Sequence, residues 1–596
     1  MVASLESVSN KSFDYIIVGG GTTGLTLAGR LSEDPKTSVL VLEAGEANLD
    51  DPNILRPALH GTHFGNKAYS WDYQTKAAHY SGKGLGGSSG INFLCWTKPP
   101  TEDVNGEDFE RLGNPGWNWE NFEKFVGRTE GFVEPSEEFK KTNGLSSENW
   151  KIGRQGPLAL SFPATIDEGE LKIQQTFVNS GLPWAKNPLS GDPNGVFFIP
   201  NTYDPKTHTR TYATTASYSP NKDRPNFTVL VSAHVHHVLT EKAQDGKLTA
   251  VGVAFEHGGK VHTVNASREV ILSAGALKSP QILELSGIGR KDVLEKIDVP
   301  LKLELPGVGE NVQEHMFLGM SWELKEDVKF DTWDLLRDPT IAAEHLKLHT
   351  TGSGLYTTGI IGFAFTTLDK VTSRAEAIYE SIKETVSKLD EKTSPPGLLD
   401  QYNILLERFK PGNGSPGCEF ISFPGLFSFP NPPEPGKRYA TTFVATNYTF
   451  SRGTIHSTSN DASKDPEFDA HYFEQDVDLE IFTEMCKFAR KMADIAPLKD
   501  MIVKELNPGP EVQTHEQMRE WVKSTFSTTW HTIGSCSLLP KEKGGVVDPD
   551  LKVYGTNNLR VADISVAPLH FGAHPQAMAY GIGEQAAEII KGKFRA

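Results

Sequence analysis

The glycine-rich stretch near the N-terminus constrains the fold more than any other feature of the chain. Its sequence, DYIIVGGGTTGLTLAGRLSEDPKTSVLVLEAG, predicts a buried strand over 15–18, a helix over 23–31 and a second buried strand over 38–43. A glycine turn joins the first strand to the helix. This order of elements is a βαβ unit, which indicates a parallel sheet with helices packed against it.

Four residues of this unit are typical of a dinucleotide site. Gly19 permits the tight turn, Gly21 lets a pyrophosphate approach the backbone at the helix N-terminus, and Gly24 lets the helix lie close to the strand. Glu43, at the end of the second strand, is placed to accept hydrogen bonds from a ribose diol. We therefore predict a bound dinucleotide, although this spacing alone does not distinguish NAD from FAD.

Composition narrows the possible ligands. With 596 residues, the chain exceeds the roughly 50–250 residues of a typical domain, so at least two substructures are expected. It carries 59 Lys and Arg against 76 Asp and Glu, a net charge of −17, without a basic cluster. That balance argues against nucleic acid or an anionic membrane as partner and favours a small molecule. Four cysteines without a CxxC pair give no metal-ligand spacing and leave room for one disulfide: Cys95, Cys418, Cys486 and Cys536.

The chain shows no sign of a membrane or secretory segment. No run reaches the roughly 18 apolar residues of a membrane span, and the first dozen residues contain no apolar stretch. We therefore expect a cytoplasmic monomer or homodimer, with secretion possible only if a presequence has been removed. The N-glycosylation sequons would matter only in that case: Asn10, Asn226, Asn265, Asn413 and Asn447.

The middle of the chain has a different pattern. Segments 156–224 and 316–539 lack nucleotide motifs and mix alternating stretches, such as RYATTFVATNYTF, with helical ones, such as DLEIFTEMCKFARKMADI. This mixture predicts a sheet with helices on its far side, capping the nucleotide-binding part.

Three further motifs identify a family resemblance. They are GKGLGGSSGINF at 82–93, GALKSPQILELSGIG at 275–289 and NNLRVADISVAP at 557–568. Together with the N-terminal unit they resemble the glucose–methanol–choline (GMC) family of FAD-dependent oxidoreductases along nearly the whole chain. The resemblance implies an α/β fold with a Rossmann-like FAD-binding domain and a substrate-binding domain of antiparallel sheet backed by helices. We assign 1–155, 225–315 and 540–596 to the first, and 156–224 and 316–539 to the second.

The resemblance also implies a set of FAD contacts. Residues 82–92 would lie along the isoalloxazine and pyrophosphate, the Val235 backbone would meet the adenine, and Asp563 would lie near the pyrophosphate and ribityl chain. Relatives that tether FAD carry a histidine where this chain has Ile91, so a noncovalent cofactor is expected. The predicted FAD-binding residues are Gly19, Gly21, Thr22, Thr23, Gly24, Glu43, Ala44, Gly86, Gly87, Ser88, Asn92, Phe93, Val235, Ala274, Asp563, Ile564, Pro575 and Gln576.

Two histidines are the predicted catalytic residues. The resemblance places His531 of WHTIGS and His574, six residues beyond Pro568, opposite the flavin N5. Hydride leaves an alcohol carbon readily when the hydroxyl proton is removed in concert, and a histidine titrates in the range that suits such a base. We assign His531 as the base and His574 as the group that orients the alcohol oxygen. His570 is given no direct role, and His315 is expected to be structural.

The substrate is less well defined by the sequence. Phe93 and Trp530 stand where aryl-alcohol oxidases carry aromatic residues, which favours a planar substrate. The phenylalanines of FISFPGLFSF could line that pocket or belong to the core: Phe420, Phe423, Phe427 and Phe429. Formate oxidases have an arginine in place of His574, so a carboxylate substrate is not favoured.

The sequence thus predicts an FAD-dependent enzyme that oxidises a primary, aromatic or allylic alcohol to the aldehyde, with O2 reoxidising the flavin to give H2O2. A quinone acceptor stays open. Two alternatives remain: the same chemistry on a sugar or short aliphatic alcohol, and a non-redox relative such as a hydroxynitrile lyase. No metal site is predicted.

Overall fold

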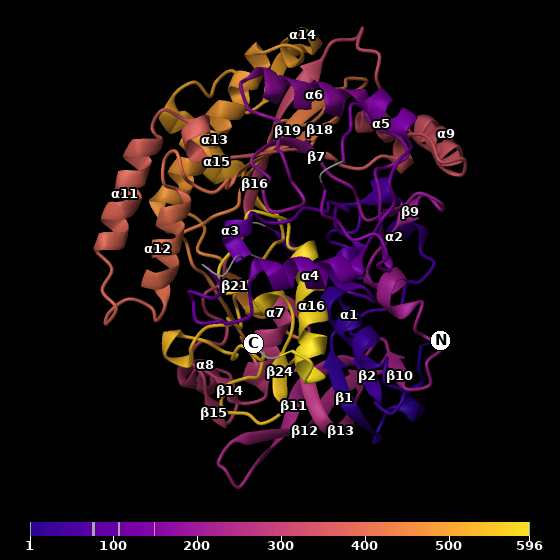
Figure 1. The fold of residues 1–596 in the computed structure, drawn as a ribbon, viewed down its shortest axis with the longest axis vertical. Helices are drawn as coiled ribbons and strands as arrows, with labels where there is room; N and C mark the ends of the chain where they lie inside the picture. Colours follow the sequence, from indigo (N-terminus) through magenta and orange to yellow (C-terminus); the bar gives the residue numbers. More distant parts are fainter. Residues whose placement is uncertain (1, 74–77, 105–107, 148–149, 595–596) are drawn as a thin grey trace.

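The computed structural model describes residues 2–73, 78–104, 108–147 and 150–594. Two seven-stranded sheets organise the chain. In Figure 1 the first occupies the lower half of the view and the second the upper half. No helix within these ranges is long and apolar enough to cross a bilayer.

The first sheet is built around the predicted βαβ unit. Its order is β10 (Phe227–Leu230), β2 (Val39–Leu42), β1 (Ser12–Val18), β13 (Lys260–Leu272), β12 (Leu248–His257) and β11 (His234–Lys242), with β24 (Leu559–Val561) also paired to β13. Strands β10, β2, β1, β13 and β24 are parallel, whereas β12 and β11 are antiparallel. The Rossmann-like arrangement is therefore confirmed.

Local sequence explains why this unit forms. The last four residues of β1 and all of β2 are buried, as expected for parallel strands covered on both faces. Helix α1 (Thr22–Leu31) begins after the glycine turn and packs against α16 (Gln576–Ile590), so the first and last α-helices of the chain lie side by side (Figure 1). The carboxyl ends of β1, β2, β13 and β24 consequently meet at one edge, where parallel α/β sheets bind ligands.

The second sheet is antiparallel. Its order is β22 (Ile502–Asn507), β16 (Met316–Leu324), β19 (Tyr439–Thr446), β18 (Cys418–Phe423), β17 (Gly362–Thr366) and β7 (Gly195–Phe198), with β23 (Ser527–Thr528) also paired to β16. Helices α6 (Glu168–Asn179) and α13 (Asp476–Lys491) pack on it. Every strand of the two sheets falls within the segment assigned to its domain from sequence; the boundaries themselves stay predictions.

Strand β18 packs against helices on one face and lines the cavity on the other. Phe420 packs against Phe177 of α6 and Phe488 of α13. Ile421, the next residue, points to the other face and lines the central cavity. The alternation gives β18 a helix-packing face and a cavity face.

The remaining elements are helices and two-stranded sheets outside the two large sheets. The remaining helices are α2 (Pro52–Leu55), α3 (Thr101–Val104), α4 (Trp119–Thr129), α5 (Glu137–Asn143), α7 (Gly275–Leu285), α8 (Lys291–Lys296), α9 (Pro339–His349), α10 (Leu368–Val371), α11 (Ala375–Ser387), α12 (Leu398–Arg408), α14 (Leu498–Met501) and α15 (His515–Thr525). Small sheets form from β3 (Ser70–Tyr73) with β4 (His79–Gly82), β5 (Glu130–Phe132) with β6 (Leu158–Leu160), β8 (Tyr203–Asp204) with β9 (Thr209–Arg210), β14 (Ile288–Gly289) with β15 (Leu303–Glu304), and β20 (Thr454–His456) with β21 (Glu467–Asp469).

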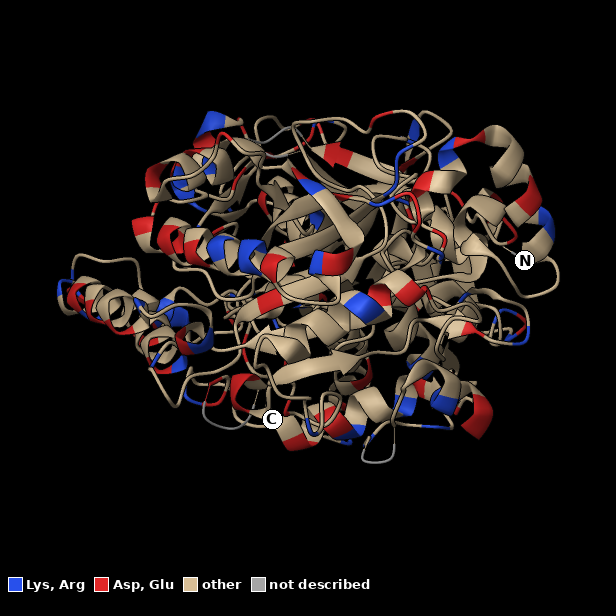
Figure 2. Cartoon of the chain, turned by 90° about the horizontal axis from the view of Figure 1, so that it is seen from above, with Lys and Arg blue, Asp and Glu red and all other residues tan. Residues whose placement is uncertain are grey.

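Two observations bear on the predictions from composition. Figure 2 shows basic and acidic residues interspersed over the helices, with neither sign gathered on one side of this view. All four cysteines are buried and free, so the disulfide for which the sequence left room does not form.

Candidate active site

A cavity of about 310 Å³ lies between the two sheets and is lined by residues of both. One end, which we call the nucleotide end, lies at the carboxyl ends of β1, β2, β13 and β24 and includes Gly21, Glu43 and Val235. The other, the histidine end, contains His531 and His574 and reaches the second sheet at Phe317 of β16 and Phe443 of β19.

Sixteen of the eighteen predicted FAD-binding residues line this cavity; the other two are Gly24 and Gly86. A Cβ on Gly24 would lie 2.1 Å from the Gly19 carbonyl oxygen, so this glycine permits the close helix–strand packing predicted for it. Gly86 has φ +98°, and a Cβ there would lie 2.5 Å from the Tyr212 ring. Gly24 is required by backbone packing and Gly86 by its positive φ and the nearby Tyr212 ring, and the predicted contact of Gly86 with the cofactor stays a prediction.

The nucleotide end fits a pyrophosphate-containing cofactor. Helix α1 begins after Gly21, where no side chain caps the helix and where a Cβ added to Gly21 would find its nearest neighbour, Gly87 Cα, at 3.9 Å. The first amide groups of α1 are therefore free to meet an anion. At the start of α16, both amide atoms of Gln576 are buried without a partner among the described residues. Buried polar atoms are rarely left unsatisfied, so Gln576 is suited to a bound ligand.

Glu43 is held rigidly at the end of β2. Its carboxylate accepts hydrogen bonds from the backbone N–H groups of Gly20 and Gly45, both at 2.8 Å, and of Gly84 at 3.1 Å. Burial raises the pKa of this carboxyl, although the three amides oppose the shift. The predicted contact between Glu43 and a ribose stays a prediction.

His531 is anchored through both its backbone and its ring. Its backbone N–H donates to Glu314 Oε1 at 2.6 Å, and its carbonyl accepts from His570 Nε2 at 2.9 Å. Its ring Nδ1 lies 3.0 Å from His315 Nδ1. Burial lowers the pKa of His531 well below its ordinary value, and the neighbouring His574 and His315 lower it further. The ring is therefore neutral, the form that can accept a proton.

His574 lies beside His531, with ring centroids 4.9 Å apart. Its Nε2 donates to Glu419 Oε1 at 2.8 Å, and its backbone N–H donates to Thr97 Oγ1 at 2.8 Å. The structure thus brings together the two histidines that the sequence predicted. Glu419, on β18, was missed because it lies 155 residues from His574 and belongs to no motif.

His315 and His570 form a layer behind His531 and do not line the cavity. Their rings stack with centroids 3.5 Å apart. The position of His570 outside the cavity lining agrees with the sequence prediction for it. His315 was expected to be structural, but its ring also contacts the ring of His531, the predicted base.

Aromatic side chains surround the histidine end. The planes of Phe93 and Trp530 lie within 1° of parallel, with centroids 6.1 Å apart, and Phe64 packs 4.4 Å from Trp530. Among the residues described, the charged ones that line the cavity are confined to the nucleotide end: Glu43, Lys278 and Asp563. The histidine end therefore offers an aromatic surface together with the imidazoles of His531 and His574; His79, whose Nε2 lies 2.7 Å from Thr532 Oγ1, also lines the cavity.

The four phenylalanines of FISFPGLFSF have different surroundings. Phe420 and Phe423 are buried in the core, whereas Phe427 lines the cavity. Phe429 is 66% exposed. Both interpretations that the sequence left open are therefore correct for part of this stretch.

A group of side chains at the nucleotide end was not predicted. The Trp71 ring contacts the ammonium groups of Lys83 and Lys278, each 4.6 Å from its centroid. Lys278 Nζ also pairs with Asp465 Oδ1 at 3.0 Å. Burial lowers the pKa of Lys278, whereas Asp465 opposes the shift. The two lysines fall inside the family motifs, but Trp71 and Asp465 lie outside them, so no pattern pointed to the group.

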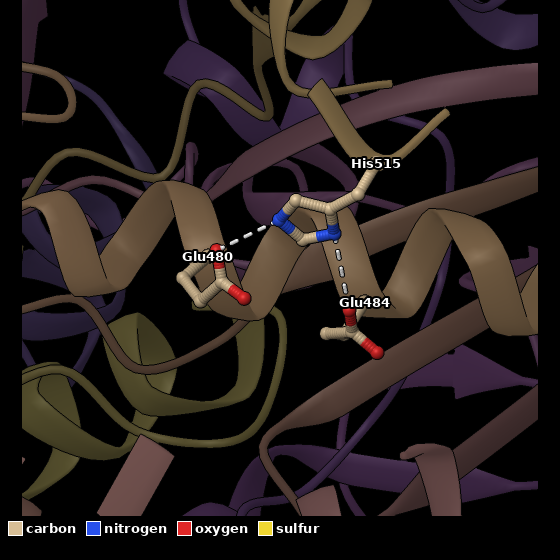
Figure 3. A group of neighbouring side chains, drawn as sticks. All are labelled: Glu480, Glu484 and His515. Atoms are coloured by element: carbon tan, nitrogen blue, oxygen red, sulfur yellow. Dashed lines mark hydrogen bonds and ion pairs between the residues drawn. The ribbon is translucent and has the colours of Figure 1, made fainter. Parts of the chain in front are cut away.

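One cluster outside the cavity has metal-like geometry. Glu480, Glu484 and His515 point toward one another in Figure 3, with His515 Nε2 3.1 Å from Glu480 Oε2. Neighbouring cations already neutralise the two carboxylates, so the group is an ion-pair network: Arg374, Lys487 and Arg519.

A nucleotide-binding end joined to a histidine pair beneath an antiparallel sheet is the arrangement expected of a dinucleotide-dependent oxidoreductase. The family models for GMC oxidoreductases match residues 13–317 and 449–583, and the chain belongs to this family. Members bind FAD, the cofactor that the nucleotide end fits.

Individual relatives agree with this assignment. The chain is 32% identical to the GMC oxidoreductase family protein Mala s 12 of Malassezia sympodialis, over 98% of this chain and 93% of the relative. An FAD-dependent oxidoreductase from Chaetomium thermophilum superposes with a TM-score of 0.88 at 29% identity, covering 98% of this chain and 99% of that one. A fungal aryl-alcohol oxidase superposes with a TM-score of 0.84 at 27% identity, covering 97% and 98%.

Proposed function

We propose that this enzyme oxidises a primary aromatic or allylic alcohol to the aldehyde, with His531 as the base and O2 as the final acceptor, giving H2O2. The bound FAD supplies the acceptor for the hydride that leaves the alcohol carbon. The observation that carries the proposal is the pairing of two imidazoles with an uncharged aromatic wall at one end of the cavity.

His531 has two properties of a base, although its lowered pKa departs from the near-neutral titration expected from the sequence. It is neutral because burial lowers its pKa, and it lines the cavity. Its Nδ1 is occupied by the contact with His315, so Nε2 is the nitrogen available to take the hydroxyl proton.

His574 is suited to hold the alcohol oxygen. Its Nε2 donates to the Glu419 carboxylate, which leaves Nδ1 facing the substrate; Nδ1 donates to the alcohol oxygen when the ring is the imidazolium paired with Glu419. Fixing the oxygen from a second direction limits the orientations of the alcohol and so favours the one in which the hydride can leave.

The lining of the histidine end supports an aromatic substrate over a sugar. A sugar site needs several polar side chains to pair with hydroxyl groups, whereas this end presents Phe64, Phe93, Phe427 and Trp530. Similarity to a fungal aryl-alcohol oxidase points in the same direction.

Anaerobic mixing with a panel of alcohols tests the proposal. Benzylic and allylic alcohols should bleach the flavin absorbance faster than glucose or short aliphatic alcohols, and an oxygen electrode should then show O2 consumption and H2O2 formation. Faster bleaching by a sugar would overturn the substrate assignment. Failure of every alcohol to bleach the flavin would favour a non-redox enzyme.

We also propose that the FAD is noncovalent, since Ile91 lines the cavity where a tethering residue would stand. Acid precipitation should release all flavin into the supernatant. Flavin that stays with the denatured chain on a gel would contradict this.

A further inference from the structure

His315, behind the cavity, and His531, which lines it, approach each other through the same ring nitrogen, Nδ1. His315 Nδ1 and His531 Nδ1 are 3.0 Å apart, a hydrogen-bond distance. A neutral imidazole carries one proton, so one of these nitrogens donates and the other accepts. Which of them donates decides where His531 keeps its lone pair.

The other nitrogen of His315 settles the direction. His315 Nε2 lies 3.0 Å from the carbonyl oxygen of Asn447, which can only accept a hydrogen bond. The proton of His315 is therefore on Nε2, and its Nδ1 is an acceptor. The reverse arrangement would set a nitrogen lone pair against a carbonyl oxygen in a buried site.

The surroundings keep this layer neutral. Burial lowers the pKa of both His315 and His570 well below the ordinary value. The hydrogen bonds of His570 are also ordered: its Nδ1 accepts from the Phe571 N–H at 3.1 Å, and its Nε2 donates to the His531 carbonyl. A charge on either stacked ring would face the other ring at 3.5 Å.

We propose that His315 is a positioning residue that holds the proton of His531 on Nδ1 and so leaves the Nε2 lone pair for the alcohol. Its effect on rate rests on the proposed function. When the hydroxyl O–H bond breaks and the proton joins His531 Nε2, the ring becomes a cation that still donates from Nδ1 to His315. That hydrogen bond then becomes charge-assisted, so it strengthens as the reaction proceeds.

The first test measures the tautomer directly and needs no substrate. Nitrogen NMR of the FAD-loaded enzyme with 15N-labelled histidine distinguishes Nδ1–H from Nε2–H rings, and the His531 signals are those lost in His531→Asn. We expect His531 protonated on Nδ1. A proton on Nε2 would overturn the proposal whether or not any alcohol is oxidised.

The second test compares two substitutions of His315. Asn places its side-chain oxygen at about the reach of Nδ1 and retains an acceptor, whereas Phe retains a ring against His570 without one. His315→Phe should slow anaerobic flavin reduction roughly 10- to 100-fold, the effect of losing one hydrogen bond to a charged group. His315→Asn should recover most of that loss.

A matched control separates this effect from the cost of altering a buried histidine. His63 is buried, and its Nε2 binds the Asn53 carbonyl at 2.7 Å. His63→Phe should leave the reduction rate within about threefold of the parent. Reduction of His315→Phe at the parent rate, or no recovery in a folded, FAD-loaded His315→Asn, would overturn the role in catalysis. If His315→Phe does not fold, the tautomer measurement and the Asn variant decide.

Discussion

The two ends of the cavity are built by different means. The nucleotide end is formed largely by backbone: glycines at the first turn, the uncapped start of α1 and three amides around Glu43. The histidine end is formed by side chains from β16, β18, β19 and the loops that carry His531 and His574. Backbone sites demand particular residues at fixed spacing, whereas side-chain sites can be assembled from distant segments in many ways.

This difference teaches where substitutions should act. A change at the nucleotide end alters backbone packing, so it should affect stability and FAD retention. A change at the histidine end should alter the rate or the choice of substrate while FAD stays bound. We expect the largest effect at the predicted base and the smallest at an ion pair outside the cavity lining.

Removal of the base gives the largest effect. His531→Ala should slow anaerobic flavin reduction by roughly 10²–10⁴, the usual cost of losing a general base, without loss of FAD. His574→Asn should retain part of the rate because an amide can still hold the alcohol oxygen, whereas His531→Asn should not. Stopped-flow reduction under argon measures all three. The opposite ranking of the two Asn variants would exchange the roles of base and orienting group.

Gly24→Ala tests the backbone end. Its Cβ would lie 2.1 Å from the Gly19 carbonyl oxygen, so we expect a loss of about 1–3 kcal/mol in the free energy of unfolding, together with weaker FAD retention. A Cβ added to Gly127 in helix α4 would meet no atom of the described residues within 4 Å. Gly127→Ala should therefore stabilise by about 0.5–1 kcal/mol. Denaturant titration of both variants checks the pair; equal effects would show that Gly24 is not sterically required.

Trp530→Ala tests whether the aromatic wall selects substrates. Loss of one aromatic contact should weaken transition-state stabilisation for benzylic alcohols more than for short aliphatic ones, by roughly 1–3 kcal/mol in kcat/KM. Steady-state kinetics on both classes gives this difference. Equal losses would mean that Trp530 only packs against Phe64 and Phe93.

The smallest effect concerns an ion pair that ties α7, at the nucleotide end, to β20. Burial alone would lower the pKa of His456, but hydrogen bonds to Glu284 and Glu310 outweigh it and raise that pKa to about 9. A raised pKa in the folded state stabilises the protein below the ordinary histidine value near 6.5, and this contribution is lost as the pH rises through 9. Between pH 7 and 9.5 we expect a loss of about 1–2 kcal/mol in unfolding free energy.

His456→Gln provides the control for that prediction. Its side chain cannot titrate, so its unfolding free energy should fall less over the same pH interval. Denaturant titrations at the two pH values measure both proteins. Parallel losses in the parent and the variant would assign the pH dependence to other groups.

The difference between the backbone-built nucleotide end and the side-chain-built histidine end also explains what the sequence could predict. The spacing of Gly19, Gly21, Gly24 and Glu43 reports the backbone geometry of one turn, and the βαβ unit follows from it. The predicted FAD-binding residues of this unit, Gly24 excepted, line the cavity, whereas those outside the unit were predicted from the family resemblance. The two histidines were found only through motifs shared with the GMC family.

The contacts that the sequence analysis missed join segments that are far apart in the chain. Glu419 reaches His574 because β18 lies between β17 and β19 in the second sheet, and nothing in the local sequence reports that order. His315 looked structural because its role depends on the ring it faces, 216 residues away. The ion pair of Lys278 with Asp465 likewise joins segments that no local pattern connects.

The alternation along β18 has a consequence for how such an enzyme can diverge. Residues on its cavity face, such as Ile421, line the space open to a substrate, whereas Phe420 on the opposite face meets α6 and α13. A mutation on the cavity face alters selectivity at little cost in helix packing. A mutation on the opposite face disturbs helix packing and leaves the cavity lining unchanged. Selection can therefore change the accepted substrate through this strand while the supporting layer keeps its residues.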